Sequence, residues 1–92
     1  MKKFLIEVPH ESDKNSCDHA IKIFRESGSH YLSKAEWGCM DGEHKSWIIV
    51  EVESKEEARL IVPPLFRSDA KIVQLVTFST FDQAEVENLH TV

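Results

Sequence analysis

Two periodicities of apolar residues predict a strand and then a helix in the first part of the chain. Alternating positions predict a strand over 2–8, which Pro9 ends and whose inward face holds Phe4, Ile6 and Val8. A helix is expected over 13–27, after an N-cap at Ser12 or Asp13 and before Gly28, which suits a left-handed position. Its inward stripe has helical spacing and consists of Cys17, Ala20, Ile21 and Phe24.

Two strands with a tight connection are expected next, over 31–40 and 44–53. Asp41-Gly42 between two β-rich segments is a strong signal for a two-residue hairpin turn. That turn pairs Trp37 with Ser46 and Glu36 with Trp47. One face then holds Ala35, Trp37, Ile48 and Val50, and the other holds Lys34, Glu36, Trp47, Ile49 and Glu51. A three-residue loop would exchange the two faces.

A second helix and a last strand complete the predicted order. Ser54 is the expected N-cap, Glu57 completes a capping box with it, and Pro63-Pro64 cannot continue the helix. The expected inward residues of this helix are Ala58, Ile61 and Leu65. The last strand is expected over 70–78 and has apolar residues at both parities, namely Ile72, Val76 and Phe78, then Val73 and Leu75.

This βαββαβ order predicts an α+β fold, a ferredoxin-like sandwich in which two helices cover one face of a four-stranded antiparallel sheet. Residues 1–78 are expected to form a single domain and residues 79–92 a C-terminal tail. A chain of 92 residues buries only roughly 60–65% of the surface that its unfolded form exposes. Self-association is therefore a natural source of further stability.

The predicted helix-free face of the sheet carries Leu5, Trp47 and Ile49. A sheet with helices on one side needs apolar residues at one parity only, and soluble monomers rarely expose a contiguous apolar patch. We therefore expect a homodimer in which a second copy of the sheet covers this face, although three scattered exposed residues are the simpler alternative.

At this point the chain resembles the dimeric α+β barrel superfamily, in which two ferredoxin-like protomers pack sheet to sheet around a cavity. The resemblance covers residues 2–78 and rests on element order, length and the short closing strand Lys71-Ile72-Val73-Gln74-Leu75-Val76. The segment from Trp37 to Trp47 is similar to the signature of a small bacterial family of such barrels that has no established activity. The resemblance implies an architecture and no catalytic residues.

Composition narrows the class of protein. The chain is 41% hydrophobic and 29% charged, with a net charge of −5, and this balance argues against a nucleic-acid partner because phosphate contacts need a basic face. Its apolar runs are too short to span a membrane, and Glu7 interrupts the N-terminal run Phe4-Leu5-Ile6 before it could serve as an export signal. A cytoplasmic location is expected.

Three functions are common among proteins with this order of helices and strands, and the chain lacks the residues that each of them requires. The segment from Lys45 to Glu51 does not have the flanked aromatics of an RNA-recognition motif. The loop after the first strand, Pro9-His10-Glu11-Ser12, has neither the CxxC of a metal chaperone nor the phosphate cradle of an acylphosphatase. The fold alone assigns no function.

No metal site or cofactor is expected, because the candidate ligands match no standard zinc spacing. These candidates are His10, His19, His30, His44, Cys17, Cys39, Glu7 and Glu51. A site, if present, would combine His10 with Glu7 or Glu51 near one end of the first strand. Cys17 and Cys39 could form a disulfide if the first helix and the second strand brought them together, but a cytosolic chain would keep them reduced.

The leading functional hypothesis is a homodimer that binds a small, partly aromatic organic molecule. Stacking would come from Tyr31, Trp37 and Trp47, and polar contacts from Glu7, His10 and Glu51. A His10–Glu7 pair would raise the pKa of the imidazole. Two other classes stay open: a cofactor-free isomerase or monooxygenase acting on an aromatic or lactone-like substrate, and a structural or partner-binding dimer without a pocket. Whether the protein is an enzyme is left undecided.

Overall fold

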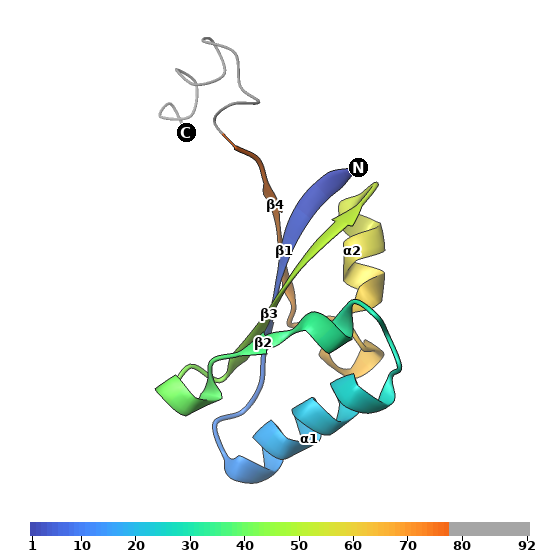
Figure 1. Ribbon diagram of the computed structural model, residues 1–92. Helices are drawn as coiled ribbons and strands as arrows, with labels where there is room; N and C mark the ends of the chain where they lie inside the picture. The colour runs from blue at the N-terminus through green and yellow to red at the C-terminus, as the bar shows by residue number, and fades with distance from the viewer. Residues whose placement is uncertain (78–92) are drawn as a thin grey trace.

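The computed structural model describes residues 1–77 and contains two α-helices and four strands (Figure 1). The strands are β1 (Lys2–Pro9), β2 (Glu36–Trp37), β3 (Lys45–Val52) and β4 (Lys71–Leu75), and the α-helices are α1 (Lys14–Glu26) and α2 (Lys55–Ile61). Three short 3-10 turns lie between them: η1 (Leu32–Lys34), η2 (Cys39–Asp41) and η3 (Pro64–Phe66). The sequence therefore predicted the order of helices and strands correctly.

The four strands form one antiparallel sheet in the order β2-β3-β1-β4. Strand β1 is central and pairs with β3 on one side and β4 on the other, so that Leu5 lies opposite both Ile49 and Val73. This arrangement confirms the predicted α+β class. Among the described residues, no helix is long and apolar enough to cross a membrane.

The core lies on the face of the sheet that both helices cover (Figure 1). Alternation in β1 and β3 buries one parity, and the buried set from these strands comprises Phe4, Ile6, Val8, Ser46, Ile48, Val50 and Val52. Helix α1 contributes Ala20 and Phe24 to the buried residues, and helix α2 contributes Ala58. The predicted inward faces of the first and third strands are therefore confirmed.

Capping residues set the ends of both helices as expected. The Asp13 carboxylate accepts a hydrogen bond from the Ser16 N–H at 3.0 Å, and Gly28 adopts a left-handed φ of 69° after α1. Ser54 Oγ accepts from the Glu57 N–H at 3.1 Å, but the Glu57 carboxylate accepts from the N–H of Glu53, one residue before the predicted one. The structure places Leu65 on the surface, where the prediction had put it inside.

The second strand is far shorter than the predicted 31–40, because η1 and η2 occupy its two ends. The predicted register is nevertheless correct, since Glu36 lies opposite Trp47 and Trp37 opposite Ser46. The connection is not a two-residue turn at Asp41-Gly42. The Gly38 carbonyl instead accepts hydrogen bonds from the N–H groups of Asp41 and Glu43, both at 3.0 Å, and this closes a longer loop.

Strand β4 ends at Leu75, three residues before the predicted end at Phe78. Ile72 is buried, whereas Val76 is exposed beyond the end of the ladder. Phe78 and the predicted tail over 79–92 lie outside the described residues.

Candidate metal centre

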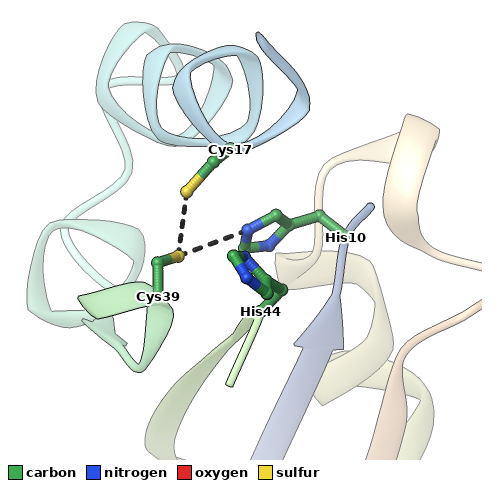
Figure 2. Close-up of side chains that lie close together, drawn as sticks. All are labelled: His10, Cys17, Cys39 and His44. Atoms are coloured by element: carbon green, nitrogen blue, oxygen red, sulfur yellow. Dashed lines mark hydrogen bonds between the residues drawn. The ribbon is translucent and has the colours of Figure 1, made fainter. Parts of the chain in front are cut away.

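Four side chains from separate segments point toward one another at one end of the sheet (Figure 2). They are His10, Cys17, Cys39 and His44, and each offers a ligand atom within 4.8 Å of the other three. The Cys17 and Cys39 sulfurs are 2.9 Å apart, and Cys39 Sγ lies 3.3 Å from His10 Nε2. We refer to these four residues as the Cys2His2 cluster.

The β1–β3 register places the two imidazoles together. Pro9 is the last residue of β1 and lies opposite Lys45, the first residue of β3, so the next pair outward is His10 and His44. The His10 N–H donates to the His44 carbonyl at 3.0 Å and continues the ladder by one bond. The two rings lie 5.6 Å apart and meet edge to face.

The loop between β2 and β3 positions Cys39. Three backbone bonds hold it: Gly38 N–H to the Lys45 carbonyl at 3.1 Å, and the two bonds that the Gly38 carbonyl accepts. Gly42 closes the turn with a φ of 83°, a value that glycine adopts without strain. Cys39 is the first residue of η2 and therefore sits between two glycines whose backbones fix its direction.

Gly38 must lack a side chain for this loop to close. A Cβ at this position would lie 2.8 Å from the Glu43 carbonyl oxygen and 2.8 Å from Trp47 Cζ3.

We expect Gly38→Ala to lower the free energy of unfolding by about 1–3 kcal/mol, which is the usual cost of overpacking. Urea unfolding of the metal-free protein measures it. Met40→Ala is the matched control, since the Met40 side chain in the same loop is fully exposed. Equal stability of both variants would contradict this account of the loop.

Helix α1 supplies Cys17 from its N-terminal end. Aromatic packing holds the helix against β2, since Phe24 and Trp37 lie with ring centroids 4.8 Å apart. Trp37 also contacts His10, with a centroid distance of 5.8 Å. One aromatic residue of β2 thus borders both the helix core and the Cys2His2 cluster.

The electrostatic environment of the cluster favours the neutral forms of His10 and Cys17. Burial lowers the pKa of His10 below its ordinary value, nearby His44 lowers it further, and Asp13 opposes both effects. The hydrogen bond to Cys39 raises the pKa of Cys17 to about 11, with a smaller contribution from burial. A metal ion that binds cysteine sulfur displaces the thiol proton, so metal affinity at such a cluster depends on pH.

Both imidazoles have a buried nitrogen without a hydrogen-bond partner in the structure. The Nδ1 atoms of His10 and His44 are in this state, and leaving such a group unsatisfied costs about 1–3 kcal/mol. Hydrogen bonding within the described residues therefore leaves one ring nitrogen of each histidine unsatisfied.

The spacing of the donor atoms is close to what a tetrahedral metal ion requires. Zinc binds sulfur at about 2.3 Å and histidine nitrogen at about 2.0–2.1 Å, which puts neighbouring ligand atoms about 3.3–3.8 Å apart. The two sulfurs are nearer than this and the widest pair is farther, so shifts of about 1 Å per pair form the shell. Rotation of these half-buried side chains supplies movements of that size.

The sequence predicted a site that combines His10 with Glu7 or Glu51. Glu7 does not pair with the imidazole: one carboxylate oxygen accepts from Trp47 Nε1 at 3.1 Å, and the other lies 3.8 Å from Lys45 Nζ. The pKa of His10 is lowered, whereas a carboxylate partner would have raised it. The candidate metal ligands that the structure brings together are two cysteines and two histidines, with neither Glu7 nor Glu51 among them.

The other predicted ligand-binding residues divide between the two faces of the sheet. Trp37 lies on the helix-covered face beside His10. Tyr31 and Glu51 line one hollow of about 380 Å³, and Trp47 lines a second of about 380 Å³. Ile49 lines both hollows. Three of the six predicted residues, Tyr31, Trp47 and Glu51, therefore lie around Ile49 and apart from His10.

A larger cavity, of about 570 Å³, adjoins the Cys2His2 cluster through His10. It is open to solvent and lies between the loop after β1, the start of α1 and the η3 turn, with Ser16, His19, Phe66 and Asp69 among its lining residues.

Comparison with known proteins identifies no relative: no family model, no curated protein and no solved structure matches this chain.

Proposed function

We propose that the protein binds one Zn²⁺ ion at His10, Cys17, Cys39 and His44 and that this ion organises one end of the domain. The observation that supports the proposal is the convergence of four donor atoms within 4.8 Å of one another from three separate segments, namely the end of β1, the start of α1 and the β2–β3 loop. No three of these residues are close in sequence, so local chain geometry does not account for their proximity.

The donor set favours zinc over other ions. Two sulfurs and two imidazole nitrogens in a tetrahedral arrangement suit Zn²⁺, whereas Mg²⁺ and Ca²⁺ prefer oxygen ligands. Two thiolates also balance the charge of the ion, which makes the occupied centre neutral in its half-buried position. A reducing compartment such as the cytoplasm would keep both cysteines available as ligands.

The number of ligands favours a structural ion over a hydrolytic one. Zinc with four protein ligands has no position left for a reactive water, which is the arrangement of structural sites. Here the ion would join the end of β1, the start of α1 and the β2–β3 loop. Helix α1 otherwise relies on a short apolar stripe, so a metal link adds a long-range constraint to a small domain.

A cysteine nucleophile is the enzymatic alternative, because Cys39 Sγ lies 3.3 Å from His10 Nε2. Such a dyad needs a thiolate beside an imidazolium. The environment acts against that ion pair, since burial and His44 lower the pKa of His10, and a second thiol lies 2.9 Å from Cys39. The pair is better suited to sharing a cation.

The metal content of the protein tests this proposal. Chains reconstituted with Zn²⁺ and freed of loosely bound ions by gel filtration should retain one zinc per chain by elemental mass spectrometry. His30→Ala is the matched control, because His30 is an exposed histidine outside the cluster, and it should also retain one. The proposal would be overturned if wild-type chains retained no zinc. It would also be overturned if His44→Ala chains retained zinc as well as wild-type chains do.

A second proposal concerns the helix-free face. We propose that the domain is ferredoxin-like and forms a homodimer through this face, as in dimeric α+β barrels. Ile49, Leu5 and Val73 form a row across three strands, and Ile49 is 59% and Val73 36% exposed. Opposite charges flank the row, with Lys3 opposite Glu51 and Glu7 opposite Lys71. A second copy placed antiparallel can match these charges.

A small organic ligand between the two sheets stays part of this second proposal. Support comes from the two hollows around Ile49, whose linings provide Trp47 and Tyr31 for stacking and Lys34 and Glu51 for polar contacts. Turnover of such a ligand by a cofactor-free isomerase or monooxygenase would need an acid or base in these hollows. A dimer whose sheets fill the hollows would instead be structural.

The dimer is tested by placing a charge at the centre of the apolar row. Each buried isoleucine contributes about 1.5–3 kcal/mol, so losing two across a two-fold interface should weaken dimerisation by at least about 100-fold. We expect Ile49→Glu to sediment as a monomer at micromolar concentration. Leu60→Glu is the matched control, since Leu60 is 66% exposed on α2, and it should sediment as the wild type does. A monomeric wild type would exclude the dimer.

A further inference from the structure

We propose that the same two cysteines form a redox switch, in which a hydroperoxide oxidises Cys17 and Cys39 to an intramolecular disulfide and the metal ion leaves. This inference rests on the proposed zinc site and concerns its regulation. It makes zinc occupancy depend on the thiol redox state of the surroundings.

The position of the two sulfurs supports the switch. They are 2.9 Å apart and point toward each other from α1 and η2, while both cysteines are free and half-buried (Figure 2). A disulfide bond is about 2.0 Å long, so closing the pair requires a movement of about 0.9 Å. The chain has no other cysteine, so neither thiol has a competing partner within it.

The surroundings allow an oxidant to reach the pair. His10, another member of the cluster, lines the open cavity of about 570 Å³, and all four members keep part of their surface in solvent. Hydrogen peroxide is small enough to enter along this side. A fully enclosed centre would have protected its thiolates, whereas this one lies at the rim of the domain.

The chemistry is a two-electron oxidation that balances with hydrogen peroxide, the simplest hydroperoxide, as the oxidant. One thiolate attacks a peroxide oxygen, an S–O bond forms, the O–O bond breaks, and the departing hydroxide takes a solvent proton to become water. The second thiolate then attacks the sulfenic sulfur, the S–S bond forms, the S–O bond breaks, and a second hydroxide is protonated to water. Two thiolates, one peroxide and two protons thus give one disulfide and two waters.

Oxidation of both thiolates weakens zinc binding, because it removes two of the four ligands. A disulfide sulfur carries no negative charge, so only the two imidazoles of His10 and His44 remain as good ligands. The new covalent bond joins α1 to the β2–β3 loop at the place where the ion had joined them. The segments stay connected in both states, and reduction of the disulfide restores the donor set.

The test follows zinc and the disulfide together in the wild-type protein. Zinc-loaded protein is treated with hydrogen peroxide at equimolar ratio, released zinc is measured with a chromogenic chelator, and the cysteines are mapped by non-reducing peptide mass spectrometry. We expect one zinc released for each Cys17–Cys39 disulfide formed, and recovery of zinc binding after dithiothreitol. In Cys17→Ser and Cys39→Ser we expect no intramolecular bond, and dimedone should trap sulfenic acid on the remaining cysteine.

The outcomes separate this inference from the zinc proposal. If the protein holds one zinc but keeps it through peroxide treatment, or releases it with sulfinic acids or intermolecular disulfides in place of the Cys17–Cys39 bond, the switch is wrong and the zinc site stands. If the reduced protein never binds zinc, the metal content before peroxide addition shows it, and both proposals fall.

Discussion

Zinc should raise the thermal unfolding midpoint of the metal-free protein by about 15–30 °C when the free ion is roughly a thousand times more concentrated than its Kd. Binding to the folded state alone then adds about 4 kcal/mol to the free energy of unfolding. For a domain of this size, each kcal/mol moves the midpoint by about 4–8 °C. Differential scanning fluorimetry or calorimetry measures the shift.

Two comparisons make this result specific to the Cys2His2 cluster. Mg²⁺ at the same concentration should leave the midpoint unchanged, because it prefers oxygen ligands. The double variant Cys17→Ala/Cys39→Ala should not respond to zinc, since it lacks both sulfur ligands. A midpoint that zinc leaves within about 2 °C of the metal-free value, or that zinc raises equally in the double variant, would mean that the four side chains do not bind the ion in the folded protein.

Replacing one thiolate should weaken zinc binding by about 100- to 1,000-fold. Structural Zn²⁺ sites bind with about 10–16 kcal/mol, or about 2.5–4 kcal/mol for each of four ligands. At about 1.4 kcal/mol per factor of ten, that share corresponds to the stated loss. The variant is Cys39→Ala, and competition with a chromogenic chelator of known affinity gives the two dissociation constants.

The matched controls for this loss are the histidines outside the cluster. His19→Ala and His30→Ala remove exposed imidazoles and should leave the dissociation constant within about two-fold of the wild type, as surface substitutions usually do. A dissociation constant that Cys39→Ala leaves unchanged would show that zinc is held by other residues, even if the protein binds it tightly.

Local patterns were sufficient to predict the elements that carry the core. In β1 and β3 the alternation of apolar residues fixed which parity is buried, and Phe4, Ile6, Ile48 and Val50 lie inside as expected. Caps at Asp13 and Ser54 began the helices where their side chains can accept from free N–H groups. These features depend on neighbours within a few positions, which a sequence displays directly.

The loop after β2 could not be predicted in the same way. Asp41-Gly42 is typical of a tight hairpin, but the chain closes at Gly38, where the packing of Trp47 from the facing strand leaves no room for a side chain. The choice between the two turns depends on that tertiary contact. Strand β2 is short because 3-10 turns on both sides replace the predicted extended segment.

The Cys2His2 cluster was not predicted because its four residues are brought together by tertiary structure and not by a standard ligand spacing. Cys39 and His44 are five positions apart, but Cys17 lies 22 positions before Cys39, and the chain contains neither CxxC nor HExxH. The useful signal was the pairing of the ends of β1 and β3, which makes His10 and His44 neighbours once Pro9 is set opposite Lys45. Aligning the two strands before searching for ligands would have found the imidazoles, and Cys17 and Cys39 would then have been the nearest sulfurs to consider.

X-ray absorption at the zinc edge of the reconstituted protein tests the central proposal most directly. The Cys2His2 cluster predicts a first shell of two sulfurs at about 2.3 Å and two nitrogens at about 2.0–2.1 Å, with the outer-shell scattering of two imidazole rings. Cys39→Ala should reduce the sulfur number to one. A shell made only of oxygen and nitrogen, or one that keeps two sulfurs in that variant, would contradict the assignment of the metal centre.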